Sequence, residues 1–338
     1  MKRIPHSRET PGELALIEAI RRQAARIRRP ATLRLGMGDD CAILRPRTGH
    51  EICVTTDFTL EGVHFRRDWH PPESVGHRCL ARGLSDLAAM GATPMAVFLS
   101  IALPARLPSA WLDRFLRGFL DLATHYRTPL AGGDTAASAS GTIAADIVAI
   151  GEVPAGTALR RSTARPGDVI YVTGFLGGAA AELRRLSGDP RKFSRKGTTS
   201  VNHPHLYPEP RLAAGRRLRN LAHAAIDISD GLSTDLTHLC QESGVAAILE
   251  EALLPIHPLA LERPDAFELA LHGGEDYELL FTADPKARIP KAIAGVPIRR
   301  IGVIRRRRAG LPVIALTTRD GRSHPVTPAG WQHFAKKR

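Results

Sequence analysis

Cysteine is scarce in this 338-residue chain, which has four cysteines: Cys41, Cys53, Cys79 and Cys240. No two of them form a CxxC pair, and none lies at a zinc-site spacing from a histidine. The sequence therefore argues against a disulfide-stapled scaffold and against a cysteine-based zinc site. This cysteine usage is typical of a reducing compartment, and we expect a cytoplasmic location.

Long uninterrupted apolar runs are lacking too. The first residues, MKRIPHSRETPGE, have no apolar core behind their charges and do not resemble a secretory signal. One uncharged stretch, LAAMGATPMAVFLSIALPA at 87–105, approaches the length of a membrane span. Gly91, Pro94 and Pro104 divide it into a helix end, a turn and a strand. We interpret it as buried core and expect no membrane partner.

Negative charge is in deficit. Lys and Arg total 47 against 34 Asp and Glu, which gives a formal net charge of +13, and only seven of the basic residues are lysine. This balance fits a polyanionic partner or phosphorylated substrates, but it fits an arginine-rich solvated surface equally well. The basic runs at 21–29, 305–308 and 336–338 lack interleaved aromatic residues. We interpret them as solvated faces and expect no nucleic-acid partner.

The common signatures of nucleotide binding and hydrolysis are absent. The chain contains no GxxxxGK[ST] loop, no HRD and DFG pair, no HExxH and no GxSxG. GMGDDC at 36–41 is not a GxGxxG turn, because Cys41 stands where the third glycine belongs. Any use of ATP therefore requires another fold.

The chain does have alternating strand and helix patterns, typical of an α/β or α+β architecture. In the first half, helices are predicted over 13–29, 74–90 and 111–126, and strands over 51–57, 97–103, 130–134 and 143–153. In the second half, strands are predicted over 168–173 and 223–228, helices over 210–221 and 231–242, and a glycine turn leading into a strand over 272–282. We assign domains to 1–155 and 156–338, and interpret 187–210 as a long, basic surface loop.

Acidic residues gather at the predicted strand ends and glycine turns. They are Asp57, Asp86, Asp134, Asp227, Asp230, Glu275 and Asp276. Asp57 ends a predicted strand, and Asp86 opens or lies early in a helix. Helix capping is a sufficient explanation for a single acid such as Asp86 or Asp230. Capping does not explain Asp57, or the GGD and GGED sequences, so the set as a whole requires another reason.

Clustered carboxylates repel one another unless they are protonated or neutralised by a cation. The ligands on offer are hard oxygens, which suit Mg²⁺, an ion that keeps several waters and bridges to substrate phosphates. Gly-Gly pairs let the backbone approach a ligand, and their N–H groups can hold phosphate oxygens. The sequence therefore predicts a magnesium-dependent phosphate site.

Six segments, in this order and spacing, carry a resemblance to a known family. They are GMGDDCAIL, VTTDFTLEGVHF, LSDLAAMGATP, LAGGDT, IDISDGLSTDLTHL and GGEDYELLFT. Together they resemble the thiamine-monophosphate kinases, members of the superfamily of aminoimidazole ribonucleotide synthetase, selenophosphate synthetase and the hydrogenase-maturation dehydratase. The resemblance extends from about residue 12 to GWQHF at 330–334. It implies a two-domain α/β (α+β) chain of the aminoimidazole ribonucleotide synthetase type, which dimerises through a sheet or barrel of its N-terminal domain.

The resemblance also implies an activity and a set of site residues. The activity is the ATP-dependent phosphorylation of thiamine phosphate to thiamine diphosphate, with several Mg²⁺ ions per site. The metal ligands implied are Asp40, Thr55, Thr56, Asp57, Asp86, Asp134, Asp227 and Asp230. Gly133, Asp134, Arg161 and Ser229 match ATP-binding positions, and His64, Glu275 and Trp331 match positions around the thiamine phosphate. The usual GGDTTRG reads GGDTAAS here, so a threonine and an arginine near the phosphates are missing.

Several of these residues have a second interpretation. His64 could be structural, Trp331 could pack the C-terminus against the body, and Glu275 could ligate metal instead of facing the thiazolium ring. Arg160 stands next to Arg161 and could make the phosphate contact in its place.

The mechanism that these residues predict needs no covalent nucleophile and no general base. The second pKa of a phosphate monoester is about 6, so thiamine phosphate is mostly dianionic at neutral pH and its oxygen is already a nucleophile. We expect direct in-line transfer, governed by positioning and charge stabilisation.

Two other functions remain open. The first is another ATP-dependent superfamily member with a different acceptor; residues 1–40 contain no cysteine and the chain ends HFAKKR, which disfavours the selenophosphate and hydrogenase-maturation enzymes. The second is a non-catalytic protein that binds nucleotide or nucleic acid, and the full set of acids counts against it.

Overall fold

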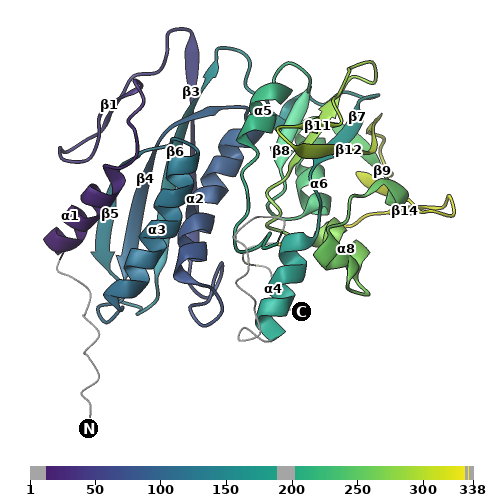
Figure 1. Cartoon of the computed structure of the whole chain (residues 1–338). Coiled ribbons are helices and arrows are strands. Elements are labelled where there is room, and N and C mark those ends of the chain that lie inside the picture. The colour runs from purple at the N-terminus through teal and green to yellow at the C-terminus, as the bar shows by residue number, and fades with distance from the viewer. Residues whose placement is uncertain (1–12, 189–201, 332–333, 335–338) are drawn as a thin grey trace. The chain divides into compact units, whose positions relative to one another are not determined.

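The computed structural model describes residues 13–188, 202–331 and 334, and the chain divides into two units. The first comprises Met1–Leu87 and Pro94–Glu152, and the second Ala88–Thr93 and Val153–Arg338. Each combines helices with sheet, as the strand and helix patterns predict (Figure 1).

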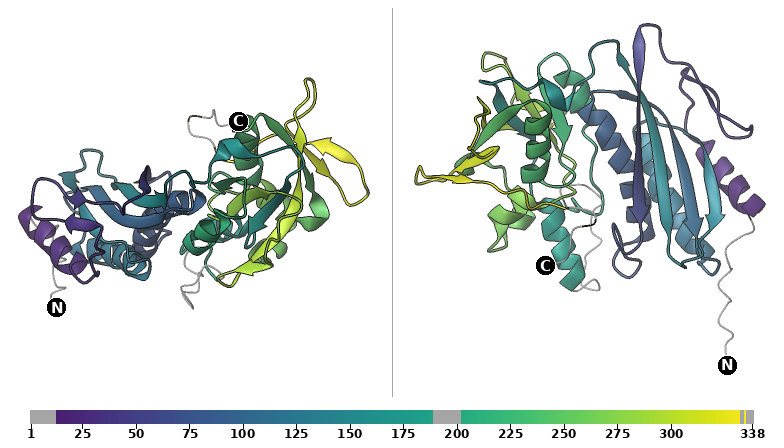
Figure 2. Two further views of the ribbon diagram at one scale, coloured as in Figure 1. Left: turned by 90° about the horizontal axis from the view of Figure 1, so that it is seen from above. Right: turned by 180° about the vertical axis from the view of Figure 1, so that it is seen from behind.

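The first unit is built on a four-stranded sheet with the order β3-β6-β4-β5, in which β4 and β5 run parallel. Its strands are β3 (His50–Leu60), β4 (Thr93–Leu103), β5 (Leu130–Ala137) and β6 (Ala144–Pro154), beside a small β1 (Leu33–Leu35) and β2 (Ile43–Leu44) pair. Its helices are α1 (Glu13–Ala24), α2 (Pro72–Ala89) and α3 (Ser109–His125). Figures 1 and 2 show α2 and α3 on one face of this sheet.

The two faces of the sheet differ because side chains alternate along β3. Cys53 and Thr59 point toward the helices and are shielded, whereas Ile52, Val54 and Phe58 point the other way and are 48%, 62% and 60% exposed. The sheet therefore has one face packed on helices and one apolar face open.

Helices α2 and α3 pack at very close range through glycine. A Cβ atom placed on Gly76 of α2 would lie 1.9 Å from the carbonyl oxygen of Phe115, and one on Gly118 of α3 would lie 1.9 Å from the carbonyl oxygen of Glu73. Since no side chain fits at these points, the two backbones contact each other directly.

The second unit is built on an eight-stranded sheet with the order β14-β13-β9-β12-β7-β10-β8, and β11 pairs with β12. Its strands are β7 (Val169–Thr173), β8 (Ala224–Asp227), β9 (Val245–Glu250), β10 (Leu279–Ala283), β11 (Ala292–Ile293), β12 (Val296–Arg306), β13 (Ile314–Thr317) and β14 (Ser323–Pro325). Its helices are α4 (Gly178–Gly188), α5 (Leu212–Leu218), α6 (Leu232–Glu242), α7 (Pro258–Leu261) and α8 (Ala266–His272), with 3₁₀ turns η1 (Arg161–Thr163) and η3 (Glu251–Leu253).

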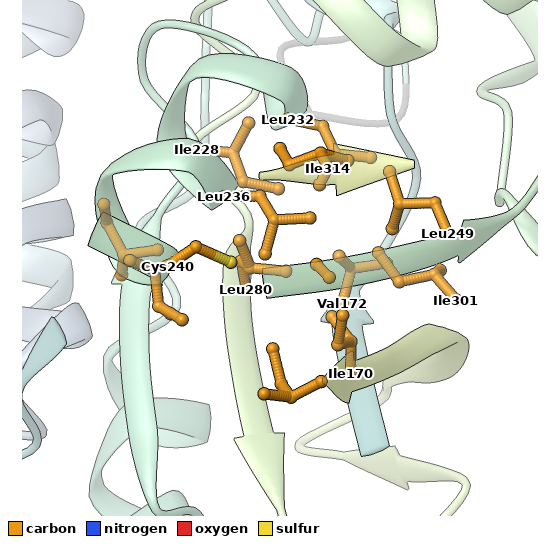
Figure 3. Close-up of a cluster of buried hydrophobic side chains, with 14 of the residues drawn as sticks. Ile170, Val172, Ile228, Leu232, Leu236, Cys240, Leu249, Leu280, Ile301 and Ile314 are labelled. Atoms are coloured by element: carbon orange, nitrogen blue, oxygen red, sulfur yellow. The ribbon is translucent and has the colours of Figure 1, made fainter. Parts of the chain in front are cut away.

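The core of this unit lies between α6 and the sheet. Leu232, Leu236 and Cys240, one face of α6, pack against Val172 of β7 and Leu280 of β10 (Figure 3). The spacing of four residues along α6 places these three side chains on one stripe. This packing fixes the start of α6 against the end of β8, where Asp227 lies.

Three predicted placements of acids are wrong. Asp57 does not end a strand, because β3 continues through three more residues to Leu60. Asp86 is not early in a helix; α2 begins at Pro72, so Asp86 lies in its last turn. Asp134 does not follow a turn, because Gly132 and Gly133 are part of β5.

The glycine pair before Asp134 has a different physical role from the predicted one. A Cβ atom on Gly133 would lie 1.8 Å from the carbonyl oxygen of Leu99, its register partner on the parallel strand β4. Gly133 is therefore required by close approach of two strands, and it keeps Asp134 on a rigid element instead of a turn.

The predicted surface loop at 187–210 is only partly testable, because 189–201 lie outside the described residues. Of the part that is described, Ser187, Gly188 and Glu209 are exposed, but His203, His205 and Leu206 are buried, so the prediction of a surface position is wrong for 203–206. Its burial is explained by hydrogen bonds to a buried carboxylate, treated below.

The uncharged stretch at 87–105 is core, as predicted: Leu87, Met95 and Val97 are buried. None of the helices in the described parts of the chain is both long and apolar enough to span a membrane.

The glycine contact between α2 and α3 predicts a specific loss of stability. We expect Gly118→Ala to lower the free energy of unfolding by about 1–3 kcal/mol, as overpacking against a backbone carbonyl does. Urea denaturation followed by circular dichroism measures it. Arg117→Ala, on the exposed side of α3, is the matched control and should change the free energy of unfolding by less than about 0.5 kcal/mol. An unchanged Gly118→Ala protein would contradict this account of the contact.

Candidate active site

In the first unit, β3 and α2 bring predicted metal ligands together. Thr55 Oγ1 donates a hydrogen bond to Asp86 Oδ2, and Asp57 Oδ1 lies 3.4 Å from Arg82 Nε. Arg82 and Asp86 are four residues apart and therefore share one face of α2. Sequence reasoning missed Arg82, although its spacing from Asp86 is a usable signal.

Thr56 lies on the opposite face of β3, as alternation requires. Its Oγ1 donates a hydrogen bond of 2.8 Å to Asp146 Oδ1 on the neighbouring strand β6. The consecutive residues Thr55, Thr56 and Asp57 therefore do not all point to one place, and Asp146 joins the acids of this region. Asp146 was not predicted, because nothing local in AADIVAI marks it.

Asp57 is electrostatically perturbed. The pKa of its carboxyl is raised to about 6: burial raises it most, Arg82 lowers it, and the nearby Asp86 and Asp146 raise it. Arg82 therefore only partly offsets the burial and the repulsion among three carboxylates. A group of this kind favours an additional cation.

Asp40, Gly133 and Asp134 line one cavity of about 790 Å³ on the open side of the sheet in the first unit. Its apolar wall includes Ile17 of α1 and Ile150 of β6. The structure thus brings together the GDD and GGD segments, which are more than 90 positions apart in sequence. A large, mostly apolar cavity with a few polar groups is typical of a small-molecule site.

His64 follows β3 and has a defined tautomer. Its Nδ1 accepts a hydrogen bond from the backbone N–H of Leu60 at 3.0 Å, and its carbonyl oxygen accepts one from the buried Arg78 at 2.8 Å. Because an accepting ring nitrogen carries no proton, neutral His64 carries its proton on Nε2. That atom is a donor of the kind that binds an oxyanion.

In the second unit, five of the predicted residues lie at or beside one turn. Asp227 ends β8, as predicted, and is buried. Ser229 accepts a hydrogen bond on its carbonyl oxygen from the N–H of Glu275 at 2.7 Å, and Asp230 accepts one on its carbonyl oxygen from the N–H of Trp331 at 3.1 Å. The backbone itself therefore holds Glu275 and Trp331 beside the turn after β8.

Glycine makes these contacts possible. A Cβ atom on Gly330 would lie 2.0 Å from the carbonyl oxygen of Asp230, and Gly231 has a φ of +112°, with a Cβ position 2.6 Å from the carbonyl oxygen of His272. Three segments distant in sequence are therefore packed backbone against backbone.

Asp235 organises this turn and was missed by sequence reasoning. Its buried Oδ2 accepts hydrogen bonds of 3.0 Å from the N–H groups of both Asp230 and Gly231. The pKa of the Asp235 carboxyl is raised to about 8, first by burial and then by Asp227 and Asp230, and the two backbone hydrogen bonds lower it only in part. An acid in the first turn of α6, four residues after Gly231, is a signal that could have found it.

Asp276 is structural. Its carboxylate accepts hydrogen bonds from the N–H of Gly177 at 2.6 Å and of Ala179 at 3.1 Å, at the N-terminus of α4. A carboxylate at this end of a helix satisfies donors that have no partner within the helix. The GGED sequence therefore supplies a helix cap from Asp276 and leaves Glu275 at the site turn.

Arg161 lies apart from this group within the second unit. Its carbonyl oxygen accepts a hydrogen bond from Ser243, just after the C-terminal end of α6, whereas Ser229 and Asp230 precede the N-terminal end. The 11 residues of α6 separate the two ends. Within this unit, the exposed Arg161 therefore lies at the other end of α6 from Ser229.

Across the described ranges, no group of three or more His, Cys, Asp or Glu side chains is placed so that it could hold a metal ion. The acids instead form small sets of carboxylates with neighbouring hydroxyl oxygens. This donor set fits Mg²⁺, which is usually held by one or two carboxylates together with waters and substrate phosphates.

The perturbed carboxyl of Asp235 predicts a pH-dependent stability. Between about pH 4 and pH 8 the folded state keeps a proton on Asp235 that the unfolded state has lost, because burial raises its pKa from 3.8 to about 8. The free energy of unfolding should therefore fall as the pH rises through this window, and level off above it. Denaturation in buffer free of divalent cations at several pH values measures the slope.

Asp235→Asn should reduce that slope, since the amide oxygen still accepts the two hydrogen bonds but does not titrate; the raised pKa values of Asp57, about 6, and of Asp276, about 7, should leave the remainder. Asp121→Asn, at an exposed position of α3, is the control and should keep the wild-type slope. A slope unchanged in Asp235→Asn would rule out Asp235 as its source.

Comparison with known proteins identifies the family. Two family models match: AIR synthase related protein, N-terminal domain, over residues 38–153, and its C-terminal domain over 165–309. The chain is 40% identical over 308 residues to thiamine-monophosphate kinase of Escherichia coli (strain K12), which covers 89% of this chain and 92% of that protein.

Solved structures of similar proteins point to the same family. The crystal structure of thiamine-monophosphate kinase from Stenotrophomonas maltophilia K279a superposes with a TM-score of 0.77 at 36% identity, covering 94% of this chain and 99% of that one. AaThiL complexed with AMPPCP and TMP gives a TM-score of 0.75 at 28% identity, covering 99% of both chains. The two-domain α/β fold implied by the sequence is thereby confirmed, and the chain belongs to the thiamine-monophosphate kinase family.

Proposed function

We propose that this chain is a thiamine-monophosphate kinase, which transfers the γ-phosphate of ATP to thiamine phosphate and gives thiamine diphosphate and ADP. The observation that carries this function is its similarity, along nearly the full length, to relatives of that name. The AaThiL complex with AMPPCP, an ATP analogue, and TMP supports the same pair of substrates. We retain 1–155 and 156–338 as the domain limits.

Mg²⁺ is the cation that the acids would hold. On the first unit we assign Asp40, Thr55, Thr56, Asp57, Asp86 and Asp134 to metal binding, and on the second Asp227 and Asp230. Support comes from the burial and the neighbouring carboxylates that raise the pKa of Asp57, and from the hydroxyl groups of Thr55 and Thr56, which donate hydrogen bonds to Asp86 and Asp146. When bound, Mg²⁺ would neutralise the negative charge of the triphosphate and of the acceptor.

ATP would be held by Gly133, Asp134, Arg161 and Ser229. The 790 Å³ cavity that Gly133 and Asp134 line is large enough for a nucleotide base or sugar and has an apolar wall. Arg161 is exposed on η1 and would bind phosphate.

Thiamine phosphate would be held by His64, Glu275 and Trp331. The Nε2–H of His64 would donate to its phosphate, and the carboxylate of Glu275 would face the cationic thiazolium ring. Trp331, with 52% of its surface exposed, is available to stack on a ring of the substrate.

The reaction would be direct in-line transfer. An oxygen of the thiamine phosphate dianion attacks the γ-phosphorus as the bond to the bridging oxygen of ADP breaks, and no phospho-enzyme forms. The protein's part is positioning and charge stabilisation, which is sufficient for phosphoryl transfer.

The protein would act as a homodimer that pairs through the open face of the first unit's sheet. The exposed apolar side chains of Ile52, Val54 and Phe58 support this, since a large exposed apolar patch is typical of an interface. A cytoplasmic location stays a prediction from cysteine usage.

A product assay tests the function. Purified protein mixed with thiamine phosphate, ATP and Mg²⁺ should give thiamine diphosphate, separated by chromatography, and a chelator should abolish it. Asp57→Asn should reduce turnover at least about 100-fold while the fold stays intact, because it removes a charged ligand from the phosphate site. Asp121→Asn on α3 is the control and should keep full activity.

Absence of product with ATP still bound would overturn the choice of acceptor and lead to a screen of other phosphorylated substrates. Product formed equally well with chelator, or full activity in Asp57→Asn, would overturn the metal assignment instead.

A charged substitution in the proposed interface tests the dimer. Val54→Asp should convert the dimer to a monomer in sedimentation velocity, because it places carboxylates in an apolar interface. Leu311→Asp, in the second unit and equally exposed at 61% against 62%, is the matched control and should leave the dimer intact. A wild-type monomer, or a dimer that survives Val54→Asp, would contradict the proposed interface.

A further inference from the structure

The segment that precedes α5 in the second unit is anchored by a buried acid, Glu182 of α4. Glu182 Oε1 lies 2.8 Å from His203 Nδ1, and Oε2 accepts hydrogen bonds from the N–H groups of His205 at 2.7 Å and Leu206 at 3.3 Å. All four residues are buried. A single carboxylate therefore fixes the backbone at 203–206.

A second acid anchors the same segment five residues further on. Glu278 accepts two hydrogen bonds from Arg211, at 2.7 Å from Nε and 2.6 Å from Nη2, and a third from Thr173 Oγ1 at 2.6 Å. Because the guanidinium and carboxylate planes match in a paired contact of this kind, Arg211 has little freedom. The backbone on both sides of His205 and Leu206 is thus held by charged, shielded groups.

His205 uses this fixed position to contact the candidate substrate site. Its ring is 1% exposed, and its Nδ1 lies 3.0 Å from Oε2 of Glu275, whose side chain is 22% exposed. The backbone of Glu275 is equally constrained, with a φ of +68° and its N–H bonded to Ser229. One carboxylate oxygen of Glu275 is therefore turned inward onto His205, and the side chain as a whole still reaches solvent.

We propose that His205 is a positioning residue for Glu275, holding its carboxylate in the orientation that faces the cationic ring of thiamine phosphate. The inference rests on the proposed function, because it takes Glu275 as a contact of that substrate. A glutamate side chain has three rotatable bonds, and a buried partner restricts them before the substrate binds. His205 itself is buried behind Glu275 and does not touch the substrate.

This role has a distinct kinetic signature. Glu275 would contact the thiazolium ring, which is remote from the reacting phosphate and binds equally in the ground and transition states. Loss of its orientation should therefore raise KM for thiamine phosphate and leave kcat and KM for ATP unchanged. We expect His205→Ala to raise KM for thiamine phosphate about 10-fold, the lower end of the effect of losing a group that orients a ligand.

The variants separate this role from a purely structural one. His203→Ala removes a partner of the same Glu182 and keeps the contact between His205 and Glu275, so it should lower thermal stability like His205→Ala and leave KM unchanged. His205→Asn, whose amide nitrogen can occupy the place of Nδ1, should restore most of the affinity. In a Glu275→Ala background, His205→Ala should raise KM no further.

Three kinetic results would overturn the proposal. They are an unchanged KM in His205→Ala, an equal rise in His203→Ala, and effects of His205→Ala and Glu275→Ala that multiply. A wild-type KM in Glu275→Ala, with thiamine diphosphate still formed, would overturn it as well while leaving the kinase function standing.

A nuclear magnetic resonance measurement tests the contact without activity. In protein labelled with ¹⁵N-histidine, Glu275→Gln should shift the ring Nδ1 signal of His205 and leave that of His203 in place. An unshifted His205 signal would overturn the inference even in an active kinase. If the wild-type protein formed no product, the proposed function would fail, and this shift would still decide whether His205 holds Glu275.

Discussion

Repulsion among partly buried carboxylates is the constraint on which the site depends. In the first unit Asp57 is surrounded by Asp86 and Asp146, and in the second Asp235 by Asp227 and Asp230. Burial, and then these neighbouring carboxylates, raise the pKa of Asp57 and of Asp235, which is unfavourable for the fold at neutral pH. Hydrogen bonds from Thr55, Thr56 and two backbone N–H groups offset only part of this. The fold therefore gives up stability to keep these acids together, as functional sites commonly do.

Such an arrangement survives only on rigid elements, and both units supply them by close backbone contact. In the first unit Gly133 lets β5 approach β4, which fixes Asp134. In the second, Gly231 and Gly330 let the turn at 228–231 touch two other segments, which fixes Glu275 and Trp331 relative to Ser229 and Asp230. A small displacement of a metal ligand or a binding group lowers the rate of phosphoryl transfer. The close backbone contacts at these glycines, which hold such groups in place, are therefore important for function.

Much of the fold and part of the site could be predicted from the sequence. Apolar periodicity located α2, α3, α6 and β6 to within a few residues, because long amphipathic segments carry a strong local signal. The acids were recognised by type, but Asp57, Asp86 and Asp134 were placed at element ends, and they lie within elements. These errors have one cause. The local sequence indicates the end of a strand or helix wherever a glycine pair or an acid occurs, but contacts with a neighbouring strand or helix can stabilise such residues within an element.

Residues that act through long-range contacts left no local signal. His205 sits in a polar, proline-rich segment that resembles a surface loop, and only Glu182 and Glu278, on α4 and just before β10, explain its burial. The same holds for Asp146, whose partner Thr56 is 90 positions away. Pattern and composition report what a residue can do within its own segment. Burial and pairing depend on which segments the fold brings together, and tertiary structure determines that.

The positions of the positive and negative side chains in this protein also depend on tertiary contacts. A chain with a net charge of +13 has its excess on exposed arginines, while its shielded positions hold Asp57, Asp227, Glu182 and Glu278. Two of these acids, Glu182 and Glu278, are fully engaged by histidine, arginine, threonine or backbone donors and stabilise the fold. Asp57 differs from them, because Arg82 lies beside it and its pKa is still raised, by burial and by Asp86 and Asp146. Glu182 and Glu278, whose oxygens accept hydrogen bonds from donors of their own chain, therefore hold segments of the fold together, whereas Asp57 lies among further carboxylates and is placed to share a cation with them.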